Sequence, residues 1–378
     1  MRFVHTAWLA SAILGASLPA DGGAEPAAAG PTIVWHDVTG WGVEGRLWED
    51  EPRAAWFDRF PAAAQETVPA PVWSLSRDSA GMLARFRTDA TAIHVRMALT
   101  KAKLAMAHMP ASGVSGVDLY ARDDAGRWRW VASSRPEQQA FEAALVAGLA
   151  PGSREYAAYL PLYNGVESLA IGVPEGAAFE GLAPRGRPVV FYGTSITHGA
   201  CASRPGMPHV AILGRRLDLA VANLGFSGNG KMDAGVGDLL ARVDAACFVI
   251  DCLPNMKATE VRERCVPFVA RLRAARPGVP IVLVEDRRNT NAWILPGQAR
   301  HHAENHAALR EAFDALVAKG VADLHYVPGD GLLGDDDEGT VDASHPTDLG
   351  FVRQADIFEP VLRASLQPDS PRATSGAK

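Results

Sequence analysis

A glycine-marked turn and a late loop of this chain carry side chains that could work together in nucleophilic catalysis. Ser195 follows an apolar run at the turn in GTSITHG, and Asp342 and His345 lie three residues apart in DASH. A serine attacks a carbonyl when a base removes its proton and a carboxylate orients that base. Side chains at positions i and i+3 of one turn can lie on the same side. We therefore expect Ser195 to be the nucleophile, His345 the base and Asp342 its orienting partner. Because Gly and Ser are also common in turns, GTSITHG taken alone is compatible with an ordinary strand end.

Two further segments offer hydrogen-bond donors for the oxyanion that such an attack creates. Gly228 lies in the glycine-rich turn NLGFSGNG, where a backbone N–H can face a substrate closely. Asn255 follows an apolar run in DCLPN, and its side-chain amide can donate two hydrogen bonds. With the backbone N–H of Ser195, these groups would form a three-donor oxyanion hole.

The elements that must position these residues follow one pattern from residue 188 to 365. Short apolar runs (VVFYG, AVANLG, AACFVIDCL, PIVLVED and LHYVPG) alternate with amphipathic helical stretches. This alternation predicts an α/β domain with a parallel sheet covered by helices on both faces. In such sheets, ligands bind beyond the carboxyl ends of the strands. All the candidate residues follow predicted strands, so we expect them to meet at that edge.

The chain before this region predicts a different domain. Residues 31–178 contain short, partly alternating β runs separated by Gly, Pro and Asp, which predicts a β-sandwich or jelly roll. One stretch, 135–149, also fits a helix. The Gly/Pro-rich segment 176–188 is the expected boundary. Aromatic side chains in this half could stack on sugars, although packing is the commoner role; the tryptophans are Trp35, Trp41, Trp48, Trp56, Trp73, Trp128 and Trp130.

The two ends of the chain and its net charge limit where the protein is expected to be located and which partners it is expected to bind. Residues 1–29 combine a cationic start, about a dozen apolar residues and a small-residue stretch, which predicts a signal peptide cleaved between Ala16 and Ala29. A buried first helix is the alternative. We expect a secreted or periplasmic protein without an integral membrane segment in the mature chain, and a disordered tail at 366–378. The net charge of −6 argues against nucleic-acid or anionic-membrane partners.

Several polar residues have two readings, and no cofactor or metal is expected. Arg204 could bind a carboxylate-bearing substrate or form a structural ion pair. Glu285 and Asp286 are expected to brace Arg287 or Arg288. His302 and His306 have the i, i+4 spacing that can bind zinc, but the sequence places no carboxylate or third ligand with them, so the cluster of His301, His302 and His306 is interpreted as a solvated face. The acidic run 335–338 could bind calcium, but it lacks the spaced ligand pattern of a dedicated loop and is interpreted as a solvated turn. Cys247 and Cys252 lie on one predicted strand and cannot bridge to each other, whereas any pairing through Cys201 or Cys265 stays open.

The four blocks together resemble the SGNH hydrolases of the GDSL lipase and esterase superfamily. GTSITHG resembles the family's Gly-Asp-Ser block with Thr194 in the Asp position, and NLGFSGNG resembles the glycine block. DCLPN matches at Asn255 but has Leu253 and Met256 where the family has Gly and Asp, and DASHP matches the Asp-x-x-His block. The resemblance spans residues 188–360 and is similar to a bacterial subgroup with an added N-terminal β-sandwich domain. It implies a flavodoxin-like catalytic domain and the residue roles given above.

The resemblance implies a serine esterase that removes short acyl groups, for which we expect acetyl. The aromatic side chains of the β-domain and the expected export favour carbohydrate as the substrate that carries these acyl groups. A lipid-directed esterase acting on phospholipid-like or longer acyl esters is the alternative within enzymes. A glycan-binding protein with an inert hydrolase domain is the alternative from another class. The sequence leaves open the acyl group, the alcohol, the oligomeric state and any contribution of the β-domain to the site.

Overall fold

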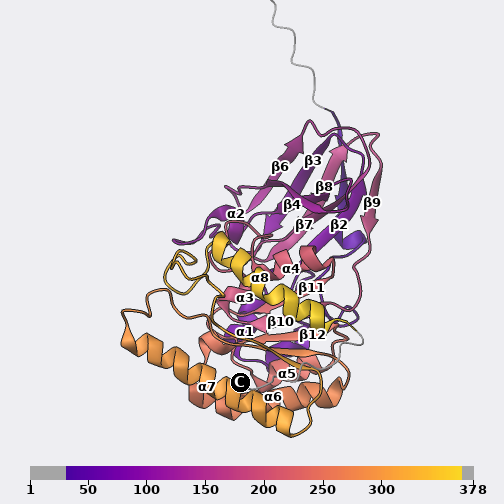
Figure 1. Cartoon of the computed structure of the whole chain (residues 1–378). Coiled ribbons are helices and arrows are strands. Elements are labelled where there is room, and N and C mark those ends of the chain that lie inside the picture. Colours follow the sequence, from indigo (N-terminus) through magenta and orange to yellow (C-terminus); the bar gives the residue numbers. More distant parts are fainter. Residues whose placement is uncertain (1–30, 368–378) are drawn as a thin grey trace, which may run out of the picture. The chain divides into compact units, whose positions relative to one another are not determined.

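Residues 31–367 are described in the computed structural model of this chain, and they contain three β-sheets (Figure 1). The predicted signal peptide at 1–29 lies outside the described residues. The predicted tail at 366–378 also lies outside them, apart from Leu366 and Gln367.

A five-stranded parallel sheet occupies the C-terminal half of the chain. Its strand order is β11-β10-β12-β13-β14, and every neighbouring pair is parallel. This is the 2-1-3-4-5 order of flavodoxin-like folds. The strands β10 to β13 consist entirely of buried residues, as expected for a sheet covered on both faces. The bounds are β10 Val189–Gly193, β11 Val221–Gly225, β12 Cys247–Asp251, β13 Ile281–Val284 and β14 Leu324–Val327.

Helices cover both faces of this sheet, and β10 shows how the two faces divide. Val190 and Tyr192 belong to the core that includes residues of α5, α6 and α7, whereas Val189 and Phe191 belong to the core that includes residues of α4 and α8 (Figure 1). The alternation follows from the period-2 geometry of a strand. The predicted doubly wound α/β fold is confirmed. The helices are α3 Ser195–His198, α4 His209–Leu217, α5 Ala234–Ala241, α6 Ala258–Ala275, α7 Pro296–Ala318 and α8 Asp348–Ser365.

Two antiparallel sheets form the N-terminal half, with strand orders β1-β8-β3-β6 and β5-β4-β7-β2-β9. They share one core that contains Phe86 and Tyr156 from one sheet and Val95 and Ile171 from the other. This packing is the predicted sandwich. The strands are β1 Ile33–Asp37, β2 Leu83–Thr88, β3 Ala92–Leu99, β4 Asp118–Arg122, β5 Trp128–Ser133, β6 Ala140–Ala147, β7 Arg154–Tyr159, β8 Val166–Pro174 and β9 Phe179–Leu182; the short helices are α1 Ala70–Ser76 and α2 Ala111–Val114.

The helix considered at 135–149 is wrong, because Ala140–Ala147 is the strand β6. Its residues pair in antiparallel register with β3, and Phe141, Ala143 and Leu145 pack on the sandwich core. Ala, Glu and Leu favour helices locally, but strand pairing and burial of alternate side chains outweigh that preference.

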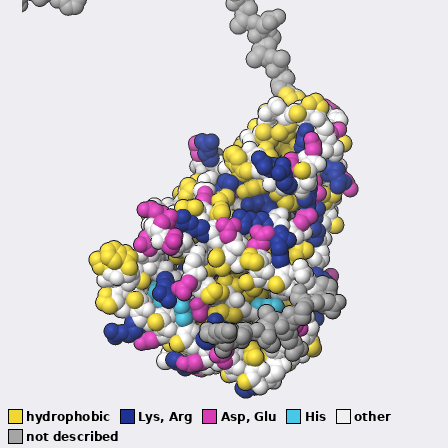
Figure 2. Space-filling view, viewed as in Figure 1, with side chains coloured by type: hydrophobic (Ala, Val, Ile, Leu, Met, Phe, Trp, Pro, Cys, Tyr) yellow, Lys and Arg dark blue, Asp and Glu magenta, His cyan; other side chains and the backbone are white. Residues whose placement is uncertain are grey.

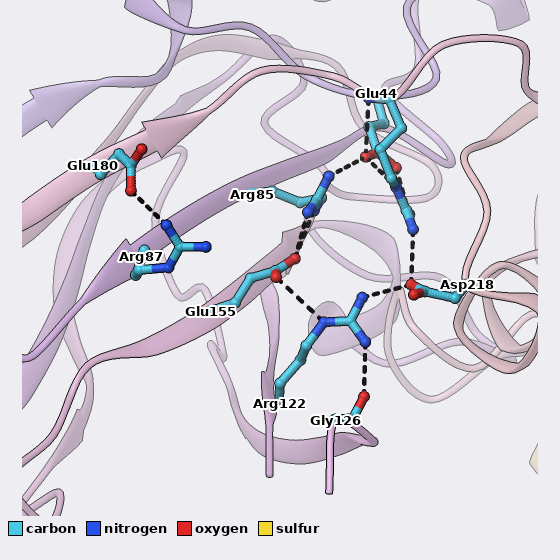
Figure 3. A network of polar contacts seen from close by, with 9 residues as sticks. Glu44, Arg85, Arg87, Arg122, Gly126, Glu155, Glu180 and Asp218 are labelled. Carbon is cyan, nitrogen blue, oxygen red and sulfur yellow. Dashed lines mark hydrogen bonds and ion pairs between the residues drawn. The ribbon is translucent and has the colours of Figure 1, made fainter. Parts of the chain in front are cut away.

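Residues 33–367 lie within one compact unit, and polar contacts join the antiparallel sheets to the α/β region. Figure 3 shows one such network. The buried carboxylate of Glu44 accepts hydrogen bonds from Arg85 and Arg185, and Arg185 also pairs with Asp218 just after α4. Arg122 bridges Glu155 of β7 and the same Asp218. The boundary expected at 176–188 stays a prediction.

Arg59 forms a second and fully buried link. Its guanidinium donates to the backbone carbonyls of Asn223 and Gly225 at the end of β11, at 3.0 and 2.8 Å, and to those of Leu75 and Asp78. Four carbonyl acceptors satisfy a charge that would be costly to bury alone. Arg59 thereby fixes the end of the strand that leads into the Gly228 turn.

The tryptophans and cysteines of the described residues serve mainly in packing. Of the seven tryptophans named above, Trp130 is 53% exposed and the other six are half-buried. All four cysteines are buried and free, so none of the pairings that the sequence left open is present. None of the helices in residues 31–367 combines the length and the hydropathy that crossing a bilayer requires.

Candidate active site

Ser195 lies at the crevice where flavodoxin-like sheets bind ligands. It follows β10, whose neighbours β11 and β12 lie on opposite sides, and this reversal of strand order is the topological switch point. Thr194 caps the short helix α3, because its hydroxyl accepts a hydrogen bond from the Ile196 N–H at 3.3 Å. Threonine and aspartate can both cap a helix, which explains how Thr194 fits where related sequences have Asp.

The structure brings Ser195, His345 and Asp342 together. Ser195 Oγ lies 2.8 Å from His345 Nε2, and His345 Nδ1 lies 2.7 Å from Asp342 Oδ2. The two residues of the first contact are 150 positions apart, so only the tertiary fold joins them. Ser195 is 7% exposed, while the side chains of His345 and Asp342 are 27% and 45% exposed. A hydroxyl, an imidazole and a carboxylate in this order can activate the oxygen for attack.

The loop that carries the base is held by the carboxylate of Asp342. Asp342 Oδ1 accepts hydrogen bonds from the backbone N–H groups of His345 and Ser344, at 2.8 and 3.1 Å. Partial burial raises the pKa of Asp342, but the hydrogen bonds from His345 and Ser344 outweigh this effect, and the net pKa is lowered. Asp342 therefore stays ionised and can hold the Nδ1–H of a neutral or a cationic imidazole.

The glycine-rich turn after β11 contacts the backbone just before Ser195 through Gly230. Gly230 packs directly against the backbone of Gly193 and Thr194, where an added Cβ would collide with the Gly193 carbonyl. Gly228 has a φ of +71°, in the left-handed region that favours glycine, and open space surrounds it. In the part of the chain that the structure describes, no acceptor takes up the backbone N–H of Ser195 or Gly228. Both N–H groups are thus available to a ligand.

Asn255 completes this set from the short 3-10 helix Leu253–Asn255 after β12. Its side-chain oxygen accepts a hydrogen bond from the Gly230 N–H at 3.2 Å, which orients the amide and leaves the NH2 group to donate. Leu253 and Met256, the departures from the family pattern, are 0% and 2% exposed and pack in the core around the sheet. Neither position would supply the nucleophile, the base or an oxyanion donor, so these departures leave the candidate catalytic groups in place.

A buried ion pair lies beneath the Ser195 turn. Arg287 pairs with both carboxylate oxygens of Asp251 at the end of β12, and it donates to Gln354 Oε1 at 2.8 Å from Nη2. The hydroxyl of Thr197 donates to the same carboxylate at 3.0 Å. Burial raises the pKa of Asp251 although Arg287 opposes the shift. This network joins α3, β12 and α8 below the candidate nucleophile.

The expectation that Glu285 and Asp286 brace Arg287 or Arg288 is wrong. Glu285 accepts hydrogen bonds from the Tyr326 hydroxyl and the Gly329 N–H, at 2.6 and 2.7 Å. Asp286 is bound by His302, and Arg288 pairs with Asp330 instead. The error arose because neighbouring side chains on an extended segment point in opposite directions.

The histidine cluster on α7 is not a solvated face. His302 is 3% exposed; its Nδ1 lies 2.8 Å from Asp286 Oδ2, and its Nε2 accepts from the Asn289 N–H at 3.1 Å. His306 Nε2 lies 2.8 Å from the Asp286 carbonyl, and His301 is half-buried. Within residues 31–367, no group of three or more His, Cys, Asp or Glu side chains is placed to hold a metal ion. The helix periodicity could have placed His302 on the inner face, since Asn305 and Leu309 are buried on the same stripe.

Arg204 forms an ion pair, which is one of the two roles that the sequence left open for it. Its guanidinium donates to Asp118 Oδ2 at 2.8 Å and to the Tyr120 hydroxyl at 2.6 Å. The acidic run 335–338 contributes Asp336, which pairs with Arg353 of α8 at 2.7 Å. Substrate binding by Arg204 stays a prediction.

The N-terminal half contributes residues that sequence reasoning missed. The hydroxyl of Tyr163, between β7 and β8, donates to the Ser195 carbonyl at 3.4 Å, and its ring stacks on His198 with centroids 4.0 Å apart. The exposed His108 lies with its ring centroid 6.4 Å from that of His345. Met109 is buried in the core that also contains Ile196. No sequence pattern marks these residues, because their proximity depends on how the sandwich packs against the sheet.

Comparisons with known proteins agree with this geometry. Residues 186–363 match the model of the GDSL-like lipase/acylhydrolase family, and residues 33–179 match the model for the N-terminus of SGNH hydro-type esterases. A solved structure from Bacteroides ovatus, described as a GDSL-like lipase, is 32% identical with a TM-score of 0.83, and the match covers 89% of this chain and 98% of that chain. A comparison with curated proteins found no match.

Two more distant structures share the fold. The salicylyl-acyltransferase SsfX3 from a tetracycline biosynthetic pathway is 19% identical with a TM-score of 0.69, over 89% of this chain and 96% of that one. An acetyl xylan esterase from the rumen bacterium Butyrivibrio proteoclasticus is 9% identical with a TM-score of 0.55, over 88% and 99%. The family models and the 32% identity to the Bacteroides ovatus structure show that the chain belongs to the GDSL-like lipase/acylhydrolase family of ester-cleaving hydrolases.

Proposed function

We propose that this protein is an exported serine esterase that hydrolyses short acyl esters, acetyl above all, on carbohydrate. The observation that carries the proposal is the continuous contact from Ser195 Oγ to His345 and on to Asp342, at 2.8 and 2.7 Å. A serine hydroxyl is a weak nucleophile by itself, and this arrangement supplies the base that it needs.

In the proposed reaction, His345 Nε2 takes the proton of Ser195 as Oγ attacks the ester carbonyl. Asp342 holds Nδ1–H and stabilises the imidazolium that forms. The proton then passes from Nε2 to the leaving alkoxide, so that an alcohol departs and an acyl-enzyme remains. Water then attacks the acyl-enzyme with His345 again as base. The carboxylic acid is released, and the proton on His345 returns to Ser195 Oγ.

The negative oxygen of each tetrahedral intermediate would be bound by three donors. These are the backbone N–H groups of Ser195 and Gly228 and the side-chain amide of Asn255. The Ser195 turn and the Asn255 amide are held in place before substrate arrives, because Gly230 packs against the backbone of Gly193 and Thr194 and donates its N–H to the Asn255 side-chain oxygen. Preorganised donors of this kind are usually the largest single contribution to acyl-transfer catalysis.

Two features support small acyl groups over long ones. Ser195 is only 7% exposed, and the Tyr163 hydroxyl of the N-terminal half donates a hydrogen bond to its carbonyl. The acetyl xylan esterase that shares this fold suggests carbohydrate as the alcohol. A lipid-directed esterase is the alternative, and it would need room for a longer acyl chain beside Ser195. A glycan-binding protein with an inert hydrolase domain is disfavoured because Ser195, His345 and Asp342 are all present and in contact.

Replacement of the nucleophile tests the proposal directly. Ser195→Ala should abolish hydrolysis of p-nitrophenyl acetate, while circular dichroism and thermal unfolding stay close to wild type. Thr259→Ala, at an exposed position in the first turn of α6, is a matched control that should keep full activity. Persistent turnover in folded Ser195→Ala protein would overturn the assignment.

A chain-length series separates the acyl classes. Activity should fall from p-nitrophenyl acetate to butyrate to octanoate, and an optimum at octanoate or longer would favour the lipid-directed alternative.

Export is tested by expressing the full chain and determining the N-terminus of the mature protein. Cleavage between Ala16 and Ala29 is expected, and an intact N-terminus at residue 1 in the cytoplasm would contradict export.

A further inference from the structure

A cavity of about 310 Å³ lies beside the loop that carries His345. Its wall includes Thr290, whose N–H donates to the Ala343 carbonyl at 2.9 Å and whose hydroxyl lies 3.0 Å from that of Thr340. Ala343 is two residues from His345, and consecutive Cα atoms are about 3.8 Å apart. The cavity wall is therefore bonded directly to the segment that positions the base.

The cavity lining combines one large aromatic face with several hydrogen-bonding side chains. Trp293 is 77% exposed and lines the cavity together with Arg288, Asn289, Asp330 and Asp337. Arg288 and Asp330 form an exposed ion pair at 3.2 Å. An aromatic ring with neighbouring amide, carboxylate and guanidinium groups suits a ring that is apolar on its faces and carries hydroxyl groups at its edge.

The cavity is built on a preformed support. Consecutive turns hold the loop before α7, with the Ala292 N–H bonded to the Asn289 carbonyl and the Leu295 N–H bonded to the Ala292 carbonyl. The buried His302 accepts from the Asn289 N–H, and His306 and Asp286 pack under Gly329 on the opposite wall. His302 and His306 of α7 thus support the base of this cavity.

The same loop also presents an apolar tip, which could suggest a lipid surface instead. Trp293, Ile294 and Leu295 are 77%, 61% and 42% exposed. Figure 2 shows a patch of hydrophobic side chains at the end of the molecule where α7 begins in Figure 1. However, Trp293 lines the cavity whereas Ile294 and Leu295 do not, and the charged side chains of Arg288, Asp330 and Asp337 line the same cavity. The lining favours a hydroxylated ring over an acyl chain or a bilayer.

We propose that this cavity binds the neutral pyranose ring of an acetylated sugar, with Trp293 stacked on the sugar face and Asp330 and Asn289 bonded to its hydroxyl groups. The inference rests on the proposed esterase function, since it assigns the alcohol part of the substrate to this side of His345. The departing alcohol would then leave next to the imidazole that protonates it. None of the seven tryptophans of the N-terminal half is required for this binding.

Selectivity between substrates tests the inference. The quantity measured is the ratio of kcat/KM for glucose pentaacetate, and for an acetylated xylo-oligosaccharide, to kcat/KM for p-nitrophenyl acetate. Trp293→Ala should lower this ratio by about five- to tenfold, because an aromatic contact contributes about 1 kcal/mol and 1.36 kcal/mol is tenfold. Most of the change should lie in KM for the sugar ester. Asp330→Ala should lower the same ratio, and Ile294→Ala is the matched control from the same tip.

Each outcome decides for or against the cavity as a sugar site. A lower ratio in Trp293→Ala and Asp330→Ala, with wild-type values in Ile294→Ala, supports it. An unchanged ratio in Trp293→Ala overturns it, and so does wild-type protein that cleaves p-nitrophenyl acetate but neither acetylated sugar. If Trp293→Ala and Ile294→Ala lose kcat/KM equally on p-nitrophenyl butyrate in detergent micelles but lose none on the acetylated sugars, the exposed tip binds a lipid surface and the sugar proposal is wrong. Failure of the proposed esterase function would give a different result, because folded Ser195→Ala protein would then still hydrolyse p-nitrophenyl acetate.

Discussion

Two substitutions at Asn255, compared with each other, separate the catalytic contribution of its amide from the structural one. The side-chain oxygen accepts from the Gly230 N–H at 3.2 Å, and the NH2 group is the proposed oxyanion donor. Asn255→Ala removes both functions. Loss of an oxyanion donor costs about 2.7–4 kcal/mol, or about 10²- to 10³-fold in kcat. Gly230 is buried, and its N–H loses its acceptor, so the free energy of unfolding should also fall by about 1–3 kcal/mol.

Asn255→Asp distinguishes the two effects. A carboxylate keeps an oxygen for the Gly230 N–H but replaces the donor with a negative charge. We expect kcat to fall at least as far as in Asn255→Ala, because the charge repels the developing oxyanion. The free energy of unfolding should stay closer to wild type than it does in Asn255→Ala.

The assay is kcat for p-nitrophenyl acetate together with urea unfolding monitored by circular dichroism. Thr259→Ala again controls for expression and handling. If folded Asn255→Ala protein keeps kcat within about threefold of wild type, the donor role is wrong and the resemblance at DCLPN does not extend to function. If Asn255→Asp retains activity, the amide does not face the oxyanion.

The remaining predictions concern Asp342, the buried ion pair and the cysteines. Asp342→Asn should lower kcat by about 10⁴-fold by favouring the wrong imidazole tautomer. Because the pKa of Asp342 is lowered from 3.8 in the folded protein, its carboxylate should stay ionised as pH falls to that value, and the acid limb of the wild-type kcat/KM profile should reflect another group. Arg287→Met, which leaves Asp251 buried and unpaired, should cost about 3–5 kcal/mol in urea unfolding, whereas the double variant with Asp251→Leu should recover most of it; an equal loss in both would contradict the ion-pair argument. Burial raises the pKa of every cysteine thiol, so mass spectrometry should find no iodoacetamide adduct at pH 8 in native protein and four after unfolding, on Cys201, Cys247, Cys252 and Cys265.

The amino-acid sequence determined the parts that depend on local pattern. The alternation of apolar runs and helices predicted the parallel sheet, since side-chain periodicity follows from backbone geometry. The spacing in DASH placed Asp342 and His345 in one turn, and the contact between their side chains is 2.7 Å. Strand ends bearing Ser195 and Asn255 had to lie at one edge, because the carboxyl ends of parallel strands do.

Local pattern failed where long-range contacts outweighed it. The segment 140–147 has the composition of a helix but pairs with β3 as a strand, and residues 348–365 form the helix α8, to which the sequence analysis assigned no helix. His302 was interpreted as solvated but is buried against Asp286, which lies 16 residues earlier.

Only the tertiary structure decided what surrounds the nucleophile. Arg59, Tyr163 and His108 come from the N-terminal half, and they reach the end of β11, the Ser195 carbonyl and the His345 ring through packing that no short motif encodes. The cavity lined by Trp293 likewise forms between two loops that are distant in sequence and joined by the hydrogen bond from Thr290 to Ala343. Strand and turn preferences act over a few residues, whereas the shape and polarity of a binding site depend on which distant segments share one core.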